Sequence, residues 1–207
     1  MTQAGARWAS TCALIALSAA AQLGGLVHLL RYDRAAIAAG EFWRLLTGNL
    51  VHLGTPHLLL NAVGLVLVAG LVGAHLRLGA WGFVLVVSSL AVTGGLWLAV
   101  PELQWYVGLS GVLHGLIAAG AAFGTASREE RWFSVMVLLV LIAKLGWEQA
   151  AGAMPGSAEA AGGPVVVDAH LFGALGGLLA TAVLAGMRRL ATGDRSGPGD
   201  RSGTPGP

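Results

Sequence analysis

A serine stands in the sequence Gly108-Leu109-Ser110-Gly111, at the expected start of an apolar helix. The N-terminus of a helix exposes backbone N–H groups that bind developing negative charge. Gly108 and Gly111 leave the hydroxyl of Ser110 uncrowded, so this serine is a candidate nucleophile for acyl transfer. The pattern is weak on its own, because serine in a membrane helix usually hydrogen-bonds to its own backbone.

A histidine, His170, lies in the last apolar stretch of the chain. An ionisable side chain in lipid is costly and is therefore a functional candidate, here as the general base for Ser110. Glycines at helical spacing accompany both residues: Gly173 and Gly177 follow His170, and Gly111 and Gly115 follow Ser110. Two such faces let helices pack closely enough for a Ser–His hydrogen bond. The alternative is tight packing with the histidine bonded to a carbonyl.

His57 and Asn61 are four residues apart at the expected start of another helix, so their side chains share one face. Both side chains can donate hydrogen bonds. Acyl transfer needs preorganised donors where the tetrahedral oxyanion forms, and we predict that these two residues supply them. The alternative is that Asn61 cross-links or caps helices while His57 faces the membrane interface.

Three further charged residues lie near these motifs. Lys144 and Glu148 are four residues apart in an apolar stretch, and we expect a solvated pair at the membrane interface, with contact to a substrate as the alternative. Asp168 lies two residues before His170 and points elsewhere on a helix. We expect it to cap that helix rather than to assist His170.

The composition indicates which elements hold these residues. Hydrophobic residues make up 56% of the 207 residues and charged residues 11%, whereas soluble domains have roughly a quarter charged. The surface must therefore face lipid. No dense basic patch interleaved with aromatics is present, which argues against a nucleic-acid partner. The six histidines form no HExxH pattern and the single cysteine no thiolate cluster, so we expect neither a metal nor a cofactor.

The apolar stretches predict an all-α membrane protein, a bundle of six transmembrane helices with an interfacial first loop. The helices are expected at about residues 11–30, 57–76, 80–100, 108–126, 132–150 and 165–187. The first is longer than the apolar core of a signal peptide, so we expect it to be retained. Residues 1–10 then form a cytoplasmic N-terminus, 11–187 the membrane domain, and 188–207 a disordered cytoplasmic tail.

The basic residues predict the orientation of this bundle. With six spans, both termini lie on one side of the membrane, and eight arginines share that side: Arg7, Arg77, Arg128, Arg131, Arg188, Arg189, Arg195 and Arg201. The other side has three: Arg31, Arg34 and Arg44. Because basic residues are enriched on the cytoplasmic side, both termini are predicted to be cytoplasmic. Ser110 and His170 then open outward.

Together these motifs resemble the rhomboid intramembrane serine proteases, in order and in expected span. The match covers HxxxN at His57–Asn61, GxSG at Gly108–Gly111, AHxxGxxxG at Ala169–Gly177, and the WR motif of the first loop at Trp43-Arg44. The resemblance implies a Ser110–His170 dyad that needs no cofactor, with a bundle embedded in the lipid bilayer. His114 departs from the family, in which many members have an aromatic residue stacked on the catalytic histidine at this position. An imidazole can stack as well, so we expect His114 to be a supporting residue rather than the base. His114 as the base is the alternative.

Within that family the chain is most similar to the rhombosortases, a short bacterial branch. The similarity lies in Trp43–Gly48, Leu50–Leu53, His57–Asn61, Gly108–Gly115 and Val167–His170. It implies a multi-pass protein of the bacterial inner membrane that processes transmembrane proteins with C-terminal GlyGly-type sorting tails. Two alternatives stay open. One is a rhomboid protease with other single-span substrates, and the other is a non-catalytic rhomboid-like binder of membrane proteins.

Overall fold

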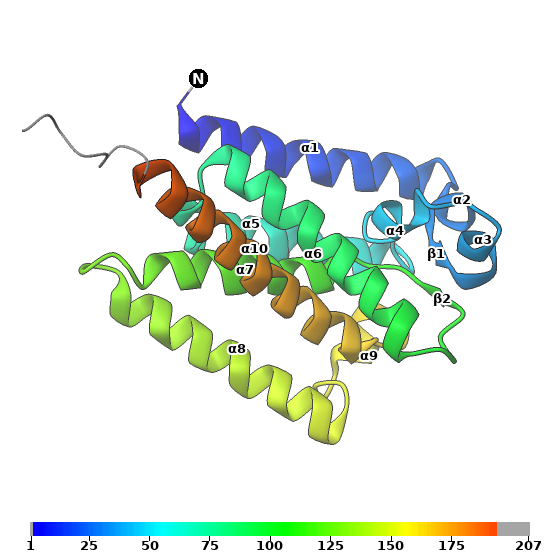
Figure 1. Ribbon diagram of the computed structural model, residues 1–207. Helices are drawn as coiled ribbons and strands as arrows, with labels where there is room; N and C mark the ends of the chain where they lie inside the picture. Colours follow the sequence, from blue (N-terminus) through cyan, green and yellow to red (C-terminus); the bar gives the residue numbers. More distant parts are fainter. Residues whose placement is uncertain (1, 194–207) are drawn as a thin grey trace, which may run out of the picture.

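The computed structural model describes residues 2–193 and consists mainly of helices that alternate in direction (Figure 1). The long helices are α1 (Gln3–Leu23), α5 (Thr55–Leu71), α6 (Leu78–Ala99), α7 (Ser110–Gly124), α8 (Arg131–Ala151) and α10 (Val167–Gly193). Shorter helices connect them: α2 (Val27–Leu30), α3 (Arg34–Ala38), α4 (Arg44–Thr47), the 3-10 helix η1 (Gly73–His75) and α9 (Ser157–Ala161). Both ends of the described chain lie at the same end of the bundle.

Each predicted span overlaps one long helix, but the boundaries of three helices, α1, α5 and α10, differ from expectation. α5 ends at Leu71, before the expected residue 76, and the 3-10 helix η1 follows it. α1 already begins at Gln3, because the hydroxyl of Thr2 caps it by accepting a hydrogen bond from the N–H of Gly5. α10 continues to Gly193, past the expected end of the last span. The remainder of the predicted disordered tail, 194–207, lies outside the described residues.

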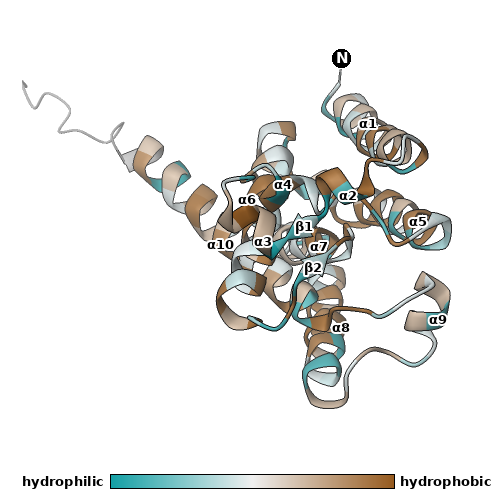
Figure 2. Cartoon of the chain, turned by 90° about the vertical axis from the view of Figure 1, so that its right-hand side faces the viewer, coloured by the Kyte–Doolittle hydropathy of each residue, from teal (hydrophilic) through white to brown (hydrophobic). Residues whose placement is uncertain are grey.

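Three of the described helices are long and apolar enough to cross a membrane: α6, α8 and α10. α5 and α7 are apolar but shorter. The prediction of six spans is therefore supported for three helices and stays a prediction for the others. Hydrophobic residues recur along α6, α8 and α10 (Figure 2). Large hydrophobic side chains remain exposed on α6 and α8, for example Leu98 at 83% and Ile142 at 64%. Such a surface suits contact with lipid.

α7 is the central helix, and most of its residues are buried. α10 packs along it and along α6, and glycines set the separation. A Cβ atom on Gly173 would overlap the carbonyl group of Gly111, and one on Gly177 would overlap that of Gly115. The backbones of α7 and α10 are thus in direct contact, as the two glycine faces predicted.

The first loop is held by a short strand pair, which is the one departure from an all-α fold in the described part. β1 (Tyr32–Asp33) pairs antiparallel with β2 (Trp105–Tyr106), so that Tyr32 is opposite Tyr106. The N–H of Gly108 also donates to the carbonyl of Gly48. The pairing fixes the segment before α7 against the first loop, although the two are some seventy residues apart in sequence.

Two arginines fasten the same loop. Arg44 is only 6% exposed, donates to the carbonyls of His28 and Arg31, and forms an ion pair with Glu41. Its neighbour in the predicted loop motif, Trp43, is 49% exposed. The guanidinium of Arg34 donates to four carbonyls in the last turn of α6 and in the segment that follows it, those of Leu96, Trp97, Val100 and Leu103. The position of this loop at a membrane interface stays a prediction.

Candidate active site

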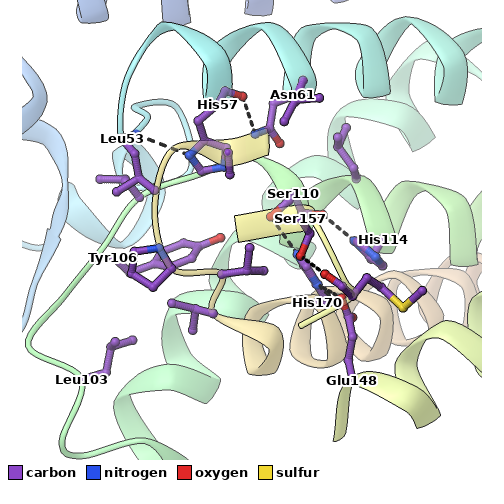
Figure 3. A pocket seen from close by; sticks show the side chains of 18 of the residues that line it. Leu53, His57, Asn61, Leu103, Tyr106, Ser110, His114, Glu148, Ser157 and His170 are labelled. Carbon is purple, nitrogen blue, oxygen red and sulfur yellow. Dashed lines mark hydrogen bonds and ion pairs between the residues drawn. The ribbon is translucent and has the colours of Figure 1, made fainter. Parts of the chain in front are cut away.

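A cavity of about 550 Å³ lies at the end of the bundle that holds the strand pair. α5, β2, α7, α8 and α10 contribute to its walls, and the α9 segment borders it (Figure 3). Ser110, His170, His57, Asn61 and His114 all line this cavity. The structure therefore brings together the polar residues that the sequence singled out in three separate motifs.

Ser110 is the first residue of α7, and the turn before it depends on Gly108. Gly108 has a φ of 132°, a conformation that L side chains rarely adopt. A Cβ atom here would also lie 2.8 Å from Cε1 of His57. Tyr106 fixes the turn by donating its hydroxyl proton to the carbonyl of Gly108 at 2.8 Å, and burial raises the pKa of this tyrosine. The glycine thus keeps the space between Ser110 and His57 open.

His170 lies on α10, and Nε2 of its ring is 3.0 Å from Oγ of Ser110. The residue is 5% exposed. The two side chains are sixty residues apart in sequence, and the glycine contacts between α7 and α10 bring them into hydrogen-bond distance. A hydroxyl that donates to a histidine nitrogen at this distance is the arrangement of an activated nucleophile.

Glu148 is the residue that the sequence reasoning placed wrongly. Its carboxylate is not a solvated interfacial group. Glu148 is 3% exposed, and its Oε2 and Oε1 atoms lie 2.9 and 3.0 Å from Nδ1 of His170. Oε1 also accepts a hydrogen bond from Nζ of Lys144 at 2.6 Å. The sequence did contain a signal for this position of Glu148, namely an acidic residue in an apolar helix near the same end of the bundle as Ser110. Its spacing to Lys144 favoured the interpretation as a simple ion pair instead.

Asp168 does not take that position. It lies in the first turn of α10, and within the part of the chain described here the acidic group in contact with His170 is that of Glu148. Asp168 is the second residue of α10, inside the helix, so the expectation that it occupies the cap position is wrong. An acidic residue in the first turn is still favourable to a helix, because it faces the positive end of the helix dipole.

His114 stacks on His170, with ring centroids 4.2 Å apart and planes inclined by 15°. Its Nδ1 lies 2.7 Å from the backbone carbonyl oxygen of Ser110, one helical turn earlier. The hydroxyl oxygen of Ser110 is instead bonded to His170. This geometry favours His170 over His114 as the partner of the hydroxyl.

His57 and Asn61 lie in the first turns of α5, across the cavity from His170. The side-chain amide of Asn61 donates to the carbonyl of His57 at 2.9 Å, which leaves its second N–H available. Nδ1 of His57 accepts from the backbone N–H of Leu53, so the ring proton of the neutral histidine is on Nε2. His52 stacks edge-on against His57, and burial together with His57 lowers the pKa of His52 to about 3.

Three of these side chains also form the group best able to hold a metal ion among the described residues. Ligand atoms of His114, Glu148 and His170 lie within 4.8 Å of one another. Both ring nitrogens of His170 are already hydrogen-bonded, one to Ser110 and one to Glu148. Binding a metal through His170 would break one of these bonds. The expectation that the protein needs no metal stays a prediction.

Comparison with known proteins gives a consistent result. A model of the Rhomboid domain matches residues 39–187. The rhomboid protease GluP of Bacillus subtilis is 27% identical over 165 residues, which cover 79% of this chain and 30% of that protein. The putative rhomboid protease YdcA of the same organism is 37% identical over 82 residues, which cover 39% of this chain and 40% of that protein. The match thus spans less than half the length of either relative.

Proposed function

The chain belongs to the rhomboid family, and from this premise we propose that it is an intramembrane serine endopeptidase with Ser110 as nucleophile and His170 as general base. The observation that carries the proposal is the 3.0 Å distance between Oγ of Ser110 and Nε2 of His170 at the wall of a cavity inside a helix bundle. Family membership and relatives named as rhomboid proteases support the same activity.

In the first half of the proposed reaction, Nε2 of His170 accepts the proton of Ser110 while Oγ bonds to the scissile carbonyl carbon. The negative charge that develops on the carbonyl oxygen requires donors already in place. The N–H of Ser110 at the start of α7 and the free N–H groups of His57 and Asn61 would supply them. His170 then gives its proton to the leaving amine, which departs and leaves an acyl-enzyme.

In the second half, water from the cavity attacks the acyl group. His170 accepts a proton from this water and returns it to Oγ of Ser110, which restores the enzyme and releases the new carboxylate. Every proton in this cycle is accounted for by His170, Ser110, the leaving amine and one water. The cycle draws on neither a metal nor a cofactor.

The substrates we propose are membrane-anchored proteins, because the cavity opens at one end of an apolar bundle. A peptide bond in a helix has its carbonyl hydrogen-bonded, so the cleaved segment must unwind first. The similarity of motifs such as Trp43–Gly48 and Gly108–Gly115 to the rhombosortases favours C-terminal GlyGly-type tails over other single-span substrates. Both described ends of the chain lie opposite the cavity, which is compatible with cytoplasmic termini and an outward-facing site in a bacterial inner membrane.

The activity is tested by co-expression with a tagged single-span substrate. We expect Ser110→Ala to abolish cleavage and to abolish labelling by a fluorophosphonate probe. Ser127→Ala, in the connection between α7 and α8, is the matched control and should retain both. Cleavage by Ser110→Ala at the rate of the original chain would refute the proposal. Labelling without cleavage of any substrate would show that the site is intact and that the proposed substrate class is wrong.

The substrate class is tested separately, with one reporter that ends in a GlyGly-type tail and a second with a generic single span. We expect preferential cleavage of the first. Equal cleavage of both would contradict the GlyGly assignment and leave the protease assignment standing. A complete lack of cleavage and labelling would instead favour the non-catalytic binder.

A further inference from the structure

The carboxylate of Glu148 lies against the ring nitrogen of His170 that faces away from Ser110 (Figure 3). We propose that Glu148 is a positioning residue, which fixes the tautomer and orientation of His170. Ser110, His170 and Glu148 then form a hydrogen-bonded triad. This inference rests on the proposed function and adds a third residue to the pair that the sequence predicts. Glu148 comes from α8, whereas Ser110 and His170 come from α7 and α10.

The hydrogen bonds of Glu148 determine which nitrogen of His170 carries the proton. Lys144 donates to Oε1 at 2.6 Å, so the carboxylate is paired with a cation and acts only as an acceptor. Nδ1 of His170, 2.9 Å from Oε2, must therefore be the donor. In the neutral ring, Nε2 then has a free lone pair directed at Oγ of Ser110. A general base for Ser110 requires this tautomer.

The same contacts hold the ring in place on three sides. Glu148 bonds to one edge, Ser110 to the opposite edge, and His114 covers a face at a centroid distance of 4.2 Å. A histidine ring that lacks a partner at Nδ1 can turn about its side-chain bonds. With both edges bonded, rotation breaks two hydrogen bonds at once, so Nε2 stays directed at the hydroxyl.

The charges favour the same role. When His170 takes the proton of Ser110, a cation forms at a residue that is 5% exposed. A buried cation needs a charged partner, and the side chain of Glu148, 2% exposed, is bonded to it directly. Lys144 is also close, with Nζ 3.4 Å from Nδ1, and would oppose the new charge. Its side chain is 32% exposed, so water screens it more than it screens the carboxylate.

The competing explanation is that Glu148 serves only as counter-ion to Lys144. Two variants of the full chain separate the explanations. Glu148→Gln keeps the size of the side chain but presents an amide that can donate to Nδ1 and favour the wrong tautomer. We expect kcat to fall at least about 100-fold, the usual scale of general-base assistance, with KM changed little. Glu148→Asp retains an acceptor-only carboxylate and should keep more activity than the amide. Glu129→Gln, an exposed glutamate in the connection between α7 and α8, is the matched control.

The double variant Lys144→Met with Glu148→Gln then decides between the two roles. If Glu148 only neutralised Lys144, removing the lysine as well would restore activity. We expect no recovery, because Nδ1 of His170 still lacks its acceptor. Recovery, or a Glu148→Gln protein with unchanged kcat, would overturn the inference while the protease activity of the original chain stood.

A readout that does not depend on cleavage is the tautomer itself. In protein labelled with ¹⁵N-histidine, we expect the ring of His170 to be protonated at Nδ1 and unprotonated at Nε2, with its signals identified by their loss in His170→Asn. Glu148→Ala should shift the ring toward the opposite tautomer. The same tautomer in both proteins would overturn the inference, and failure of the proposed function would appear instead as a lack of Ser110 labelling.

Discussion

His114 lies flat against His170, its ring one helical turn from Ser110 on the same helix. The contact joins α7 to α10 beside the hydrogen bond between Ser110 and His170. Because the hydroxyl of Ser110 is bonded to Nε2 of His170, the ring of His114 acts here as a flat surface rather than as the proton acceptor for the hydroxyl.

Replacing His114 by phenylalanine therefore preserves the feature that matters. We expect His114→Phe to retain most of the kcat, since a flat ring still covers His170, and His114→Ala to lose about fivefold, in line with a stacking contact of roughly 1 kcal/mol. Steady-state cleavage assays on both variants measure this. An inactive but folded His114→Phe protein would assign the base to His114 instead.

Because the backbones of α7 and α10 are in direct contact, the effect of a glycine-to-alanine substitution on stability should depend strongly on its position in α10. Gly173→Ala forces a methyl group into the carbonyl of Gly111, and we expect it to destabilise the protein by about 1–3 kcal/mol, the usual cost of overpacking, and to lower activity by moving His170. Gly186→Ala on the same helix meets open space and should be neutral or slightly stabilising. Thermal unfolding in detergent compares the two. Equal effects of both substitutions would contradict the packing argument.

The two polar residues of α5 are expected to act on the transition state. His57→Ala and Asn61→Ala each remove a donor for the oxyanion, and we expect each to lower kcat by about 10²-fold with little change in KM. The double variant should lose less than the product of the two, because the groups act on one oxygen atom. Asn61 also donates to the carbonyl of His57, so melting temperatures must accompany the kinetics. A rise in KM alone would assign both residues to substrate binding.

His52 predicts how stability depends on pH. Burial and the nearby His57 lower its pKa to about 3, against roughly 6.5 in an unfolded chain. Between these values the unfolded chain binds more protons, so the free energy of unfolding falls as the pH drops below about 6.5. We expect His52→Phe, which keeps a ring against His57, to gain about 2 kcal/mol relative to the original chain between about pH 7 and about pH 4.5. Parallel thermal unfolding at the two pH values measures this. Identical pH dependence in both proteins would refute it.

Much of the fold follows from the sequence alone. Apolar stretches of about the length of a membrane-spanning helix predicted where the long helices lie, because hydrophobicity is a local property of the chain. The glycine spacing in α7 and α10 predicted two helix faces of small residues that pack closely, and Gly173 does lie against Gly111. The candidate site residues Ser110, His170 and His57 were selected from local motifs, and all line one cavity.

The tertiary structure decided what local patterns leave open. Lys144 and Glu148 are four residues apart, and their spacing predicts an ion pair without showing what the carboxylate also faces. Glu148 reaches His170 only because α8 packs beside α10, and the strand pair of Tyr32 and Tyr106 exists only because the first loop folds back on the segment before α7. Spacing along one helix determines neighbours on that helix. Contacts between helices depend on how the whole bundle packs, and that packing decided the partner of His170.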